Sequence, residues 1–322
     1  MVARPVPPVP AAAGSSPARA GRPAPASPPP AAGSGPAQPP PAARGRLTID
    51  RPGAYDISDA DYHADPVPGG SLSSTGARRL LPPSCPAIFR YELDHPRETA
   101  AFDLGKAAHL LVLGAGAELV IIAEADWRKK AAQEARDAAR KAGKIPLLAA
   151  EHEQVLAMAA ALRGHPIASA LFDPGRGGRA EKSLFWEADG IWKRARLDWL
   201  PLISDRPIVA DYKTARSADP GSFAKAVANF GYHVQAAHYL EGLQVLTGAH
   251  GAFVFAVQEK EPPYLVTVCE LDATALRIGK EQGRRAAEIY RDCKEAGVWP
   301  GYSTDIELIS LPPWAARAEE YA

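Results

Sequence analysis

"RARLDWLPLISDRPIVADYKTARS", residues 194–217, holds two apolar runs that each carry one aspartate, Asp198 and Asp211, and the second run continues to Lys213. Runs of branched and aromatic residues separated by Pro, Ser and Asp predict two β-strands joined by a turn. If the chain turns symmetrically between Ser204 and Asp205, the strands are antiparallel neighbours and the two aspartates face each other. The stretch therefore predicts a pair of acids at one point of a sheet.

The three charged groups need a physical reason to lie together. Like charges in facing positions of a strand pair are destabilising unless one is protonated or a cation lies between them. Asp211 and Lys213 are two residues apart, so their side chains leave the same face of the strand. This arrangement suits metal-assisted hydrolysis of a phosphodiester, because Mg²⁺ takes carboxylate oxygens and lowers the pKa of its bound water. A lysine beside the ion can orient that water, or accept its proton if the lysine pKa is depressed.

The Asp-x-Lys pattern alone does not decide the chemistry. The chain contains a second copy, from Asp292 to Lys294, within a helix-like stretch. A short pattern of this kind also fits a surface ion pair on an edge strand. Both interpretations of Asp211 and Lys213 stay open until the rest of the chain is considered.

Four motifs occur in a fixed order along the chain. They are Gly-x-x-x-His ending at His109, Leu-Asp ending at Asp198, Asp-x-Lys from Asp211, and Gln-x-x-x-Tyr from Gln235 to Tyr239, the last pair on one helix face. Together with "LSSTGARRLLPPSCPAIFRYEL" at residues 72–93, these motifs resemble the RecB-like branch of the PD-(D/E)xK nuclease superfamily. The resemblance is closest to the RecE-type exodeoxyribonucleases (exodeoxyribonuclease VIII) and covers residues 54–314.

The resemblance implies a role for each matched residue. The implied metal ligands, for Mg²⁺ with Mn²⁺ able to substitute, are His109, Asp198, Asp211 and the carbonyl of Tyr212. The implied catalytic residues are Asp198, Asp211 and Lys213. Residues implied to support the site or contact DNA are Gln235, Tyr239, Ser73 and Arg78. Glu181, in "AEKSLFWE", is either an acid that supports this site or, as we favour here, an edge-strand carboxylate in water.

The resemblance also implies an activity and partners. RecE-type enzymes degrade one strand of linear double-stranded DNA from an end and pass the exposed strand to a single-strand annealing protein, in recombination or repair. They work as ring-shaped homo-oligomers, so we expect a cytoplasmic, nucleoid-associated enzyme without membrane contact. One alternative is a DNA-binding module that has lost catalysis, although neither aspartate nor the lysine is missing. The other is a RecB-like nuclease that serves spacer capture or restriction.

Composition divides the chain into two parts. Residues 1–46 are almost wholly Pro, Ala, Gly, Ser and Arg, which predicts a disordered tail with polyproline II character. Residues 47–322 alternate strand-like and helix-like segments, which predicts a single α/β (α+β) domain around a mixed central sheet. The resemblance implies that this is a PD-(D/E)xK nuclease domain with helices on both faces of the sheet. The tail holds five arginines and the whole chain has zero net charge, so the domain carries about five net negative charges. Any nucleic-acid contact must therefore use local positive charge.

The cysteine count excludes two kinds of cysteine-bound metal site, and the longest apolar run excludes a membrane span. Three scattered cysteines are too few for a zinc ribbon or a four-cysteine iron–sulfur cluster. The longest apolar run, from Ala107, contains His109, Glu118 and two glycines, so it is too short and too polar to be a membrane span.

Overall fold

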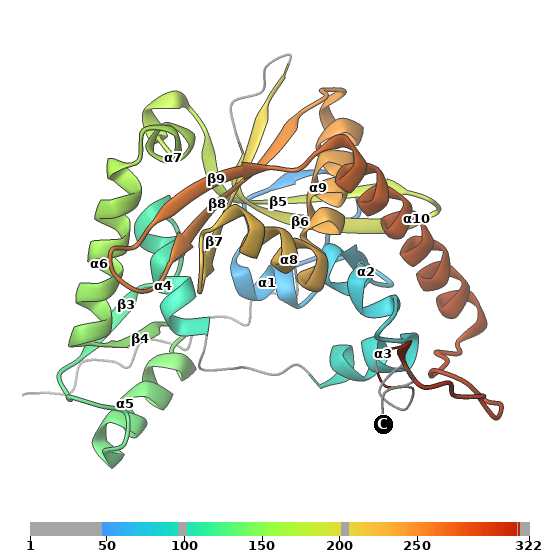
Figure 1. The fold of residues 1–322 in the computed structure, drawn as a ribbon, viewed down its shortest axis with the longest axis horizontal. Coiled ribbons are helices and arrows are strands. Elements are labelled where there is room, and N and C mark those ends of the chain that lie inside the picture. Colours follow the sequence, from blue (N-terminus) through green and yellow to red (C-terminus); the bar gives the residue numbers. More distant parts are fainter. Residues whose placement is uncertain (1–46, 96–101, 201–205, 314, 316–322) are drawn as a thin grey trace, which may run out of the picture. The chain divides into compact units, whose positions relative to one another are not determined.

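The computed structural model describes residues 47–95, 102–200, 206–313 and 315 (Figure 1). The predicted tail, residues 1–46, and the predicted turn at Ser204 lie outside the described residues. The domain division into residues 1–46 and 47–322 accordingly remains a prediction.

A mixed seven-stranded sheet forms the centre of the described domain. Six strands pair in the order β1-β5-β6-β7-β8-β9, and β2 pairs with β6. Parallel pairing occurs between β7 and β8 and between β2 and β6, while the other pairs are antiparallel. The strands are β1 (Gly53–Tyr55), β2 (Leu72–Ser73), β5 (Arg179–Ala188), β6 (Ile191–Leu200), β7 (Ile208–Ala215), β8 (Ala252–Glu259) and β9 (Val266–Glu270); β3 (Leu119–Ile122) and β4 (Ile145–Leu148) form a separate parallel pair.

Helices cover both faces of this sheet, as predicted (Figure 1). The side chains of α4, α6 and α7 pack with Ala210 and Tyr212 of β7 in one core cluster. Those of α8 and α9 pack with Val209 of β7 and Phe255 of β8 in another. The helices are α1 (Asp59–His63), α2 (Ser74–Leu80), α3 (Pro86–Asp94), α4 (Phe102–Leu113), α5 (Lys130–Lys141), α6 (Ala149–Gly164), α7 (Pro166–Leu171), α8 (Pro220–Phe230), α9 (Tyr232–Thr247) and α10 (Ala273–Ala296), with a 3₁₀ turn at Pro174–Arg176.

Local sequence signals account for several element ends. The hydroxyl of Ser73 accepts a hydrogen bond from the Gly76 N–H and begins α2. The pattern of residues 222–248 predicts one continuous helix, but the structure has two, α8 and α9. They separate at Gly231, whose φ of 63° is the left-handed conformation that ends helices. The break turns the chain sharply at the edge of the candidate site described below.

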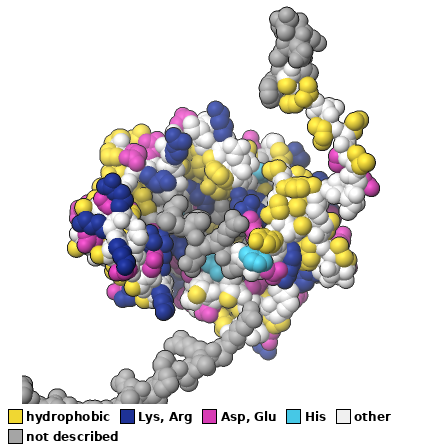
Figure 2. All heavy atoms as spheres, turned by 90° about the horizontal axis from the view of Figure 1, so that it is seen from below, with side chains coloured by type: hydrophobic (Ala, Val, Ile, Leu, Met, Phe, Trp, Pro, Cys, Tyr) yellow, Lys and Arg dark blue, Asp and Glu magenta, His cyan; other side chains and the backbone are white. Residues whose placement is uncertain are grey.

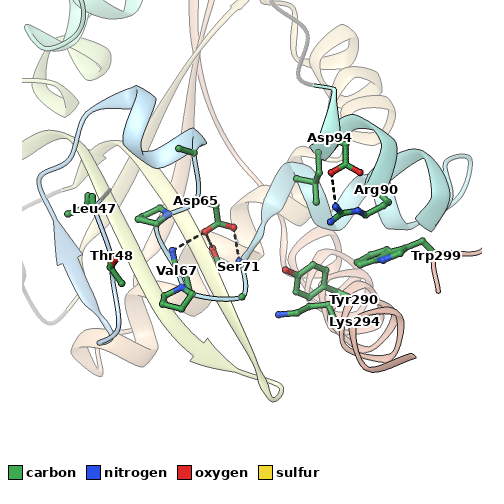
Figure 3. A pocket seen from close by; sticks show the side chains of 16 residues that line it. Leu47, Thr48, Asp65, Val67, Ser71, Arg90, Asp94, Tyr290, Lys294 and Trp299 are labelled. Atoms are coloured by element: carbon green, nitrogen blue, oxygen red, sulfur yellow. Dashed lines mark hydrogen bonds and ion pairs between the residues drawn. The ribbon is translucent and has the colours of Figure 1, made fainter. Parts of the chain in front are cut away.

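Two surface features lie apart from the predicted site. A cavity of about 690 Å³ opens between residues 64–71 and the helices α3 and α10 (Figure 3), and neither aspartate of the opening motif lines it. After α10 the chain continues without regular structure, and Ile306, Leu308 and Ile309 are almost fully exposed. Figure 2 shows hydrophobic side chains along a segment that projects in this way. None of the described helices has the length and apolar character needed to cross a bilayer.

Candidate active site

The sheet opens between β6 and β7 where the two aspartates face each other. Trp199 pairs with Ala210, and this register places Asp198 opposite Asp211, as predicted. Beyond that pair the Tyr212 N–H donates to a side chain, Asp198 Oδ2 at 2.8 Å, instead of to a main-chain carbonyl of β6. The Asp198 carboxylate therefore takes the place of a strand-to-strand hydrogen bond and lies within the opening.

Asp211 and Lys213 lie on the same face of β7. Their side chains form an ion pair, with Lys213 Nζ 2.6 Å from Asp211 Oδ2. The other oxygen, Oδ1, accepts a hydrogen bond from Gln235 Nε2 of α9 at 2.7 Å. Asp211 is only 1% exposed, so both contacts are made in a nearly water-free environment. An interpretation as a surface ion pair on an edge strand is wrong, since β7 lies between β6 and β8.

His109 reaches the opening from α4, on the other side of the sheet. Its Nδ1 lies 3.5 Å from Asp198 Oδ2, and its ring packs edge-on against the ring of Tyr212. Burial, and then the nearby charge of Lys213, hold the pKa of His109 below its ordinary value. The imidazole is therefore neutral near pH 7, which is the form that binds metal ions.

Glu181 completes a third acidic position beside Asp198. In the β5–β6 ladder Ala180 pairs with Trp199 and Lys182 with Leu197, so Glu181 is opposite Asp198. One ligand atom each from His109, Glu181 and Asp198 lie within 4.8 Å of one another.

The environment of Glu181 differs from the sequence prediction. Its side chain is 22% exposed and forms an ion pair with Arg196 at 2.5 Å. Because this side chain is mostly buried and ion-paired, the favoured interpretation as an edge-strand carboxylate in water is wrong. Glu181 also has a φ of 57°, a conformation that is uncommon for residues other than glycine and is typical of functional sites.

Burial and mutual repulsion set the charge states of the site. Burial raises the pKa of Asp198 and of Asp211 to about 6 each, although the Lys213 charge acts in the opposite direction. Burial also lowers the pKa of Lys213, but attraction to Asp211 and Asp198 outweighs it, and the pKa lies above its ordinary value. The condition under which Lys213 accepts a proton from water, a depressed pKa, is therefore not met. Lys213 is a protonated donor.

The donor set fits a divalent cation. The carboxylates of Glu181 and Asp198 and the neutral imidazole of His109 form one group of ligand atoms, whereas Asp211 lies opposite Asp198 outside that group, with its oxygens on Gln235 and Lys213. Hard oxygen ligands of this kind suit Mg²⁺ or Mn²⁺. The raised pKa values of the two aspartates measure an electrostatic cost that a bound cation would offset.

The remaining predicted residues occupy different environments. Tyr239 is 8% exposed, packs against Phe253, and hydrogen-bonds Gln235, so it supports Asp211 through Gln235 rather than facing DNA. The hydroxyl of Ser73 is used as the cap of α2. The Arg78 side chain is half-buried, and its guanidinium makes no hydrogen bond or ion pair with the described residues. The Tyr212 side chain is buried and donates to Gln258, so only its main chain faces the opening.

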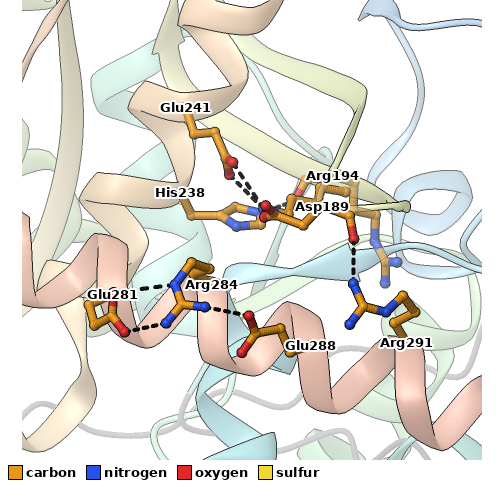
Figure 4. Close-up of polar contacts among 9 residues, drawn as sticks. Asp189, Arg194, His238, Glu241, Glu281, Arg284, Glu288 and Arg291 are labelled. Atoms are coloured by element: carbon orange, nitrogen blue, oxygen red, sulfur yellow. Dashed lines mark hydrogen bonds and ion pairs between the residues drawn. The ribbon is translucent and has the colours of Figure 1, made fainter.

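An ionic cluster around the buried Lys193 holds β6 in place next to the site (Figure 4). Lys193, which is 2% exposed, contacts both Asp189 at 2.6 Å and Glu241 at 2.9 Å. His238 of α9 hydrogen-bonds the Arg194 carbonyl at 3.0 Å. These contacts join α9, which carries Gln235, to the strand that carries Asp198, so they fix the two sides of the opening relative to each other.

The family model for the PDDEXK-like domain of unknown function (DUF3799) matches residues 83–312. The chain belongs to this family. The match places it in the PD-(D/E)xK nuclease superfamily and confirms the predicted fold class. It covers the segments that carry His109, Glu181, Asp198, Asp211 and Lys213, while Ser73 and Arg78 precede it.

A solved structure agrees on the fold. A crystal structure of a protein from Eubacterium rectale, provisionally described as an exonuclease, aligns with 80% of this chain and 97% of its own, with a TM-score of 0.56 and 14% identity. The structure of SSO0001 aligns with 65% of this chain and 99% of its own at 16% identity, but the TM-score of 0.23 is too low to carry an argument. No curated protein matches the sequence.

Proposed function

We propose that this protein is a Mg²⁺-dependent exodeoxyribonuclease of the RecE type, which hydrolyses linear double-stranded DNA from an end. The observation that carries the proposal is the opening between β6 and β7, where Asp198, Asp211 and Lys213 converge. Membership of a PDDEXK-like family and the provisional description of the Eubacterium rectale protein support it. The order of the four sequence motifs supports the RecE type in particular.

Each side chain of the opening has a task in this proposal. A divalent ion held by Asp198, Asp211, His109 and the Tyr212 carbonyl, with Glu181 beside it, would supply a bound water of lowered pKa and positive charge for the phosphate. Lys213, protonated and fixed by Asp211, donates a hydrogen bond that orients the attacking water or a phosphate oxygen.

Two residues beside the opening support these tasks. Gln235 holds Asp211 in place by donating to its second oxygen, so the carboxylate keeps one orientation. Arg78 has no acidic partner among the described residues, and its free guanidinium suits a DNA phosphate.

The biological setting follows from the RecE type and is part of the proposal. It comprises recombination or repair in the cytoplasm, a single-strand annealing protein as partner, and a ring of several copies of the chain. A catalytically inactive DNA-binding module is disfavoured by the completeness of the site. A RecB-like nuclease for spacer capture or restriction differs in the ends and strands it cuts, so substrate choice separates it from a RecE-type enzyme.

The test compares end-labelled linear duplex DNA with a covalently closed circle, with Mg²⁺, with Mn²⁺ and with EDTA. We expect mononucleotides from the linear duplex only when metal is present, and an intact circle. Lys213→Ala should lower the activity by about two to four orders of magnitude, whereas Lys294→Ala, in the second Asp-x-Lys pattern on α10, should retain it. Linear DNA that stays intact with both metals would overturn the nuclease proposal, and a cut circle would overturn the exonuclease.

A further inference from the structure

The corner between α8 and α9 places two aromatic rings and a cation next to Lys213. The Lys213 ammonium lies over the ring of Tyr232, 5.1 Å from its centroid. The ring of Phe230 lies 5.7 Å from that of Tyr232, inclined by 35°. Phe230 is 54% exposed, so one of its surfaces is open to solvent. The rings extend outward from the catalytic lysine.

Tyr232 is rigidly held on its inner side. Its ring stacks on Phe223 at 5.9 Å and lies 5.7 Å from Phe255, and both of these partners are buried in the core. These contacts fix the orientation of the Tyr232 ring, and the Phe230 ring packs against it. An exposed aromatic ring fixed in this way loses little conformational freedom on binding, which favours a stacking ligand.

Arg78 approaches the same corner from α2. A Cβ at Gly231 would overlap the Arg78 side chain, so the arginine stem lies directly on the glycine between the two aromatic residues. The guanidinium has no hydrogen bond or ion pair with any described residue, although it is half-buried. A cation that is partly desolvated and unpaired is costly unless a ligand supplies the negative charge.

We propose that Phe230, Tyr232 and Arg78 form a subsite for one unpaired nucleotide at the DNA end, with its base stacked on Phe230 and its phosphate on Arg78. A single exposed Phe is common on protein surfaces. Phe230 differs because the unpaired Arg78 lies beside it. Its ring also contacts Tyr232, the ring over which the Lys213 ammonium lies. A π-face binds any base, so the subsite takes unpaired ends without sequence preference. A paired end must fray before its base can enter.

This inference rests on the proposed nuclease function, and its test uses binding separately from cleavage. The probes are short DNA duplexes with a single-stranded overhang, whose terminal nucleotide carries 2-aminopurine, carries adenine or is an abasic site. Affinity and 2-aminopurine fluorescence are measured in EDTA at fixed salt for the wild type, Phe230→Ala and Phe230→Leu. Tyr91→Ala is the matched control, because Tyr91 on α3 is also 54% exposed.

Wild type should quench the 2-aminopurine, and Phe230→Ala should lose the quenching and bind the base-bearing overhang about tenfold more weakly. Both proteins should bind the abasic overhang equally, Phe230→Leu should recover only part of the loss, and Tyr91→Ala should match the wild type. Equal weakening on both overhangs, or no weakening, would overturn the subsite. Cleavage of the adenine overhang by wild type in Mg²⁺ is measured in parallel, and its absence would refute the nuclease function whatever the binding data show.

Discussion

Asp211→Asn should stabilise the metal-free protein while it abolishes cleavage. Asp211 is 1% exposed and faces Asp198 across the opening, so its negative charge is both desolvated and repelled. Asparagine has almost the same shape and carries no charge. Its one oxygen can accept from Gln235, but its amide NH₂ group then faces Lys213, which loses its acceptor. Catalysis requires the carboxylate as a metal ligand, so stability and activity should change in opposite directions.

The magnitude follows from the pKa of Asp211, which burial raises from 3.8 to about 6. A group whose pKa is higher in the folded state stabilises the fold below its unfolded pKa, and this contribution is lost as the pH rises through about 6. At pH 8 the ionised carboxylate therefore costs about 3 kcal/mol relative to the unfolded chain. The attraction of Lys213 is already contained in this pKa, but the acceptor that Lys213 loses takes back about 1 kcal/mol, so Asp211→Asn should gain about 2 kcal/mol.

The assay is urea unfolding at pH 8, in EDTA and in Mg²⁺. In EDTA Asp211→Asn should be the more stable protein, while Mg²⁺ should stabilise the wild type by mass action and the variant much less. Asp292→Asn removes an exposed carboxylate from the second Asp-x-Lys pattern. It should change the free energy of unfolding by no more than about 0.5 kcal/mol, in EDTA or in Mg²⁺. A variant less stable than wild type in EDTA, or equal stabilisation of both by Mg²⁺, would refute the reasoning.

Three further changes test the surroundings of the site. His109→Ala should raise the Mg²⁺ concentration needed for half-maximal cleavage at least about tenfold, and an unchanged titration would remove His109 from the ligands. Burial lowers the pKa of His238 to about 3, so the stability of wild type relative to His238→Gln should fall by about 1.4 kcal/mol per pH unit as the pH falls below 6.5; unfolding curves whose pH profiles are parallel for the two proteins would contradict this. Gly279→Ala should destabilise by about 1–3 kcal/mol, because a Cβ there would overlap the His233 carbonyl oxygen, whereas Gly283→Ala, with open space around it, should not; equal Tm values for the two variants would contradict this packing.

The elements and the main acids could be predicted from the sequence because they depend on local patterns. Alternation within residues 194–217 sets which side chains share a face, and it placed Asp211 and Lys213 together and Asp198 opposite. The motif order added His109 and Gln235, which the structure brings to the same opening. These predictions needed only strand register and helix periodicity.

The missed features depend on tertiary structure. Glu181 lies opposite Asp198 in the β5–β6 ladder with a positive φ, a conformation that the letters "AEKSLFWE" do not reveal. The pKa of Lys213 depends on the balance between its burial and two facing carboxylates, a balance that exists only in the folded chain. The close approach of Arg78 from α2, which leaves no room for a Cβ at Gly231, likewise exists only in the folded chain.

Single-turnover cleavage by Lys213→Ala, beside its affinity for the same duplex at fixed salt, tests the proposed role of the opening most directly. If Lys213 orients the attacking water, the variant should cleave about two to four orders of magnitude more slowly than wild type. Its affinity should fall little, because many contacts hold a phosphate backbone and only one is lost. Lys213→Arg should not restore the rate, since a planar guanidinium cannot take the place of the ammonium between Asp211 and Tyr232. Cleavage at the wild-type rate with tenfold weaker binding would contradict the proposal and make Lys213 a phosphate-binding residue.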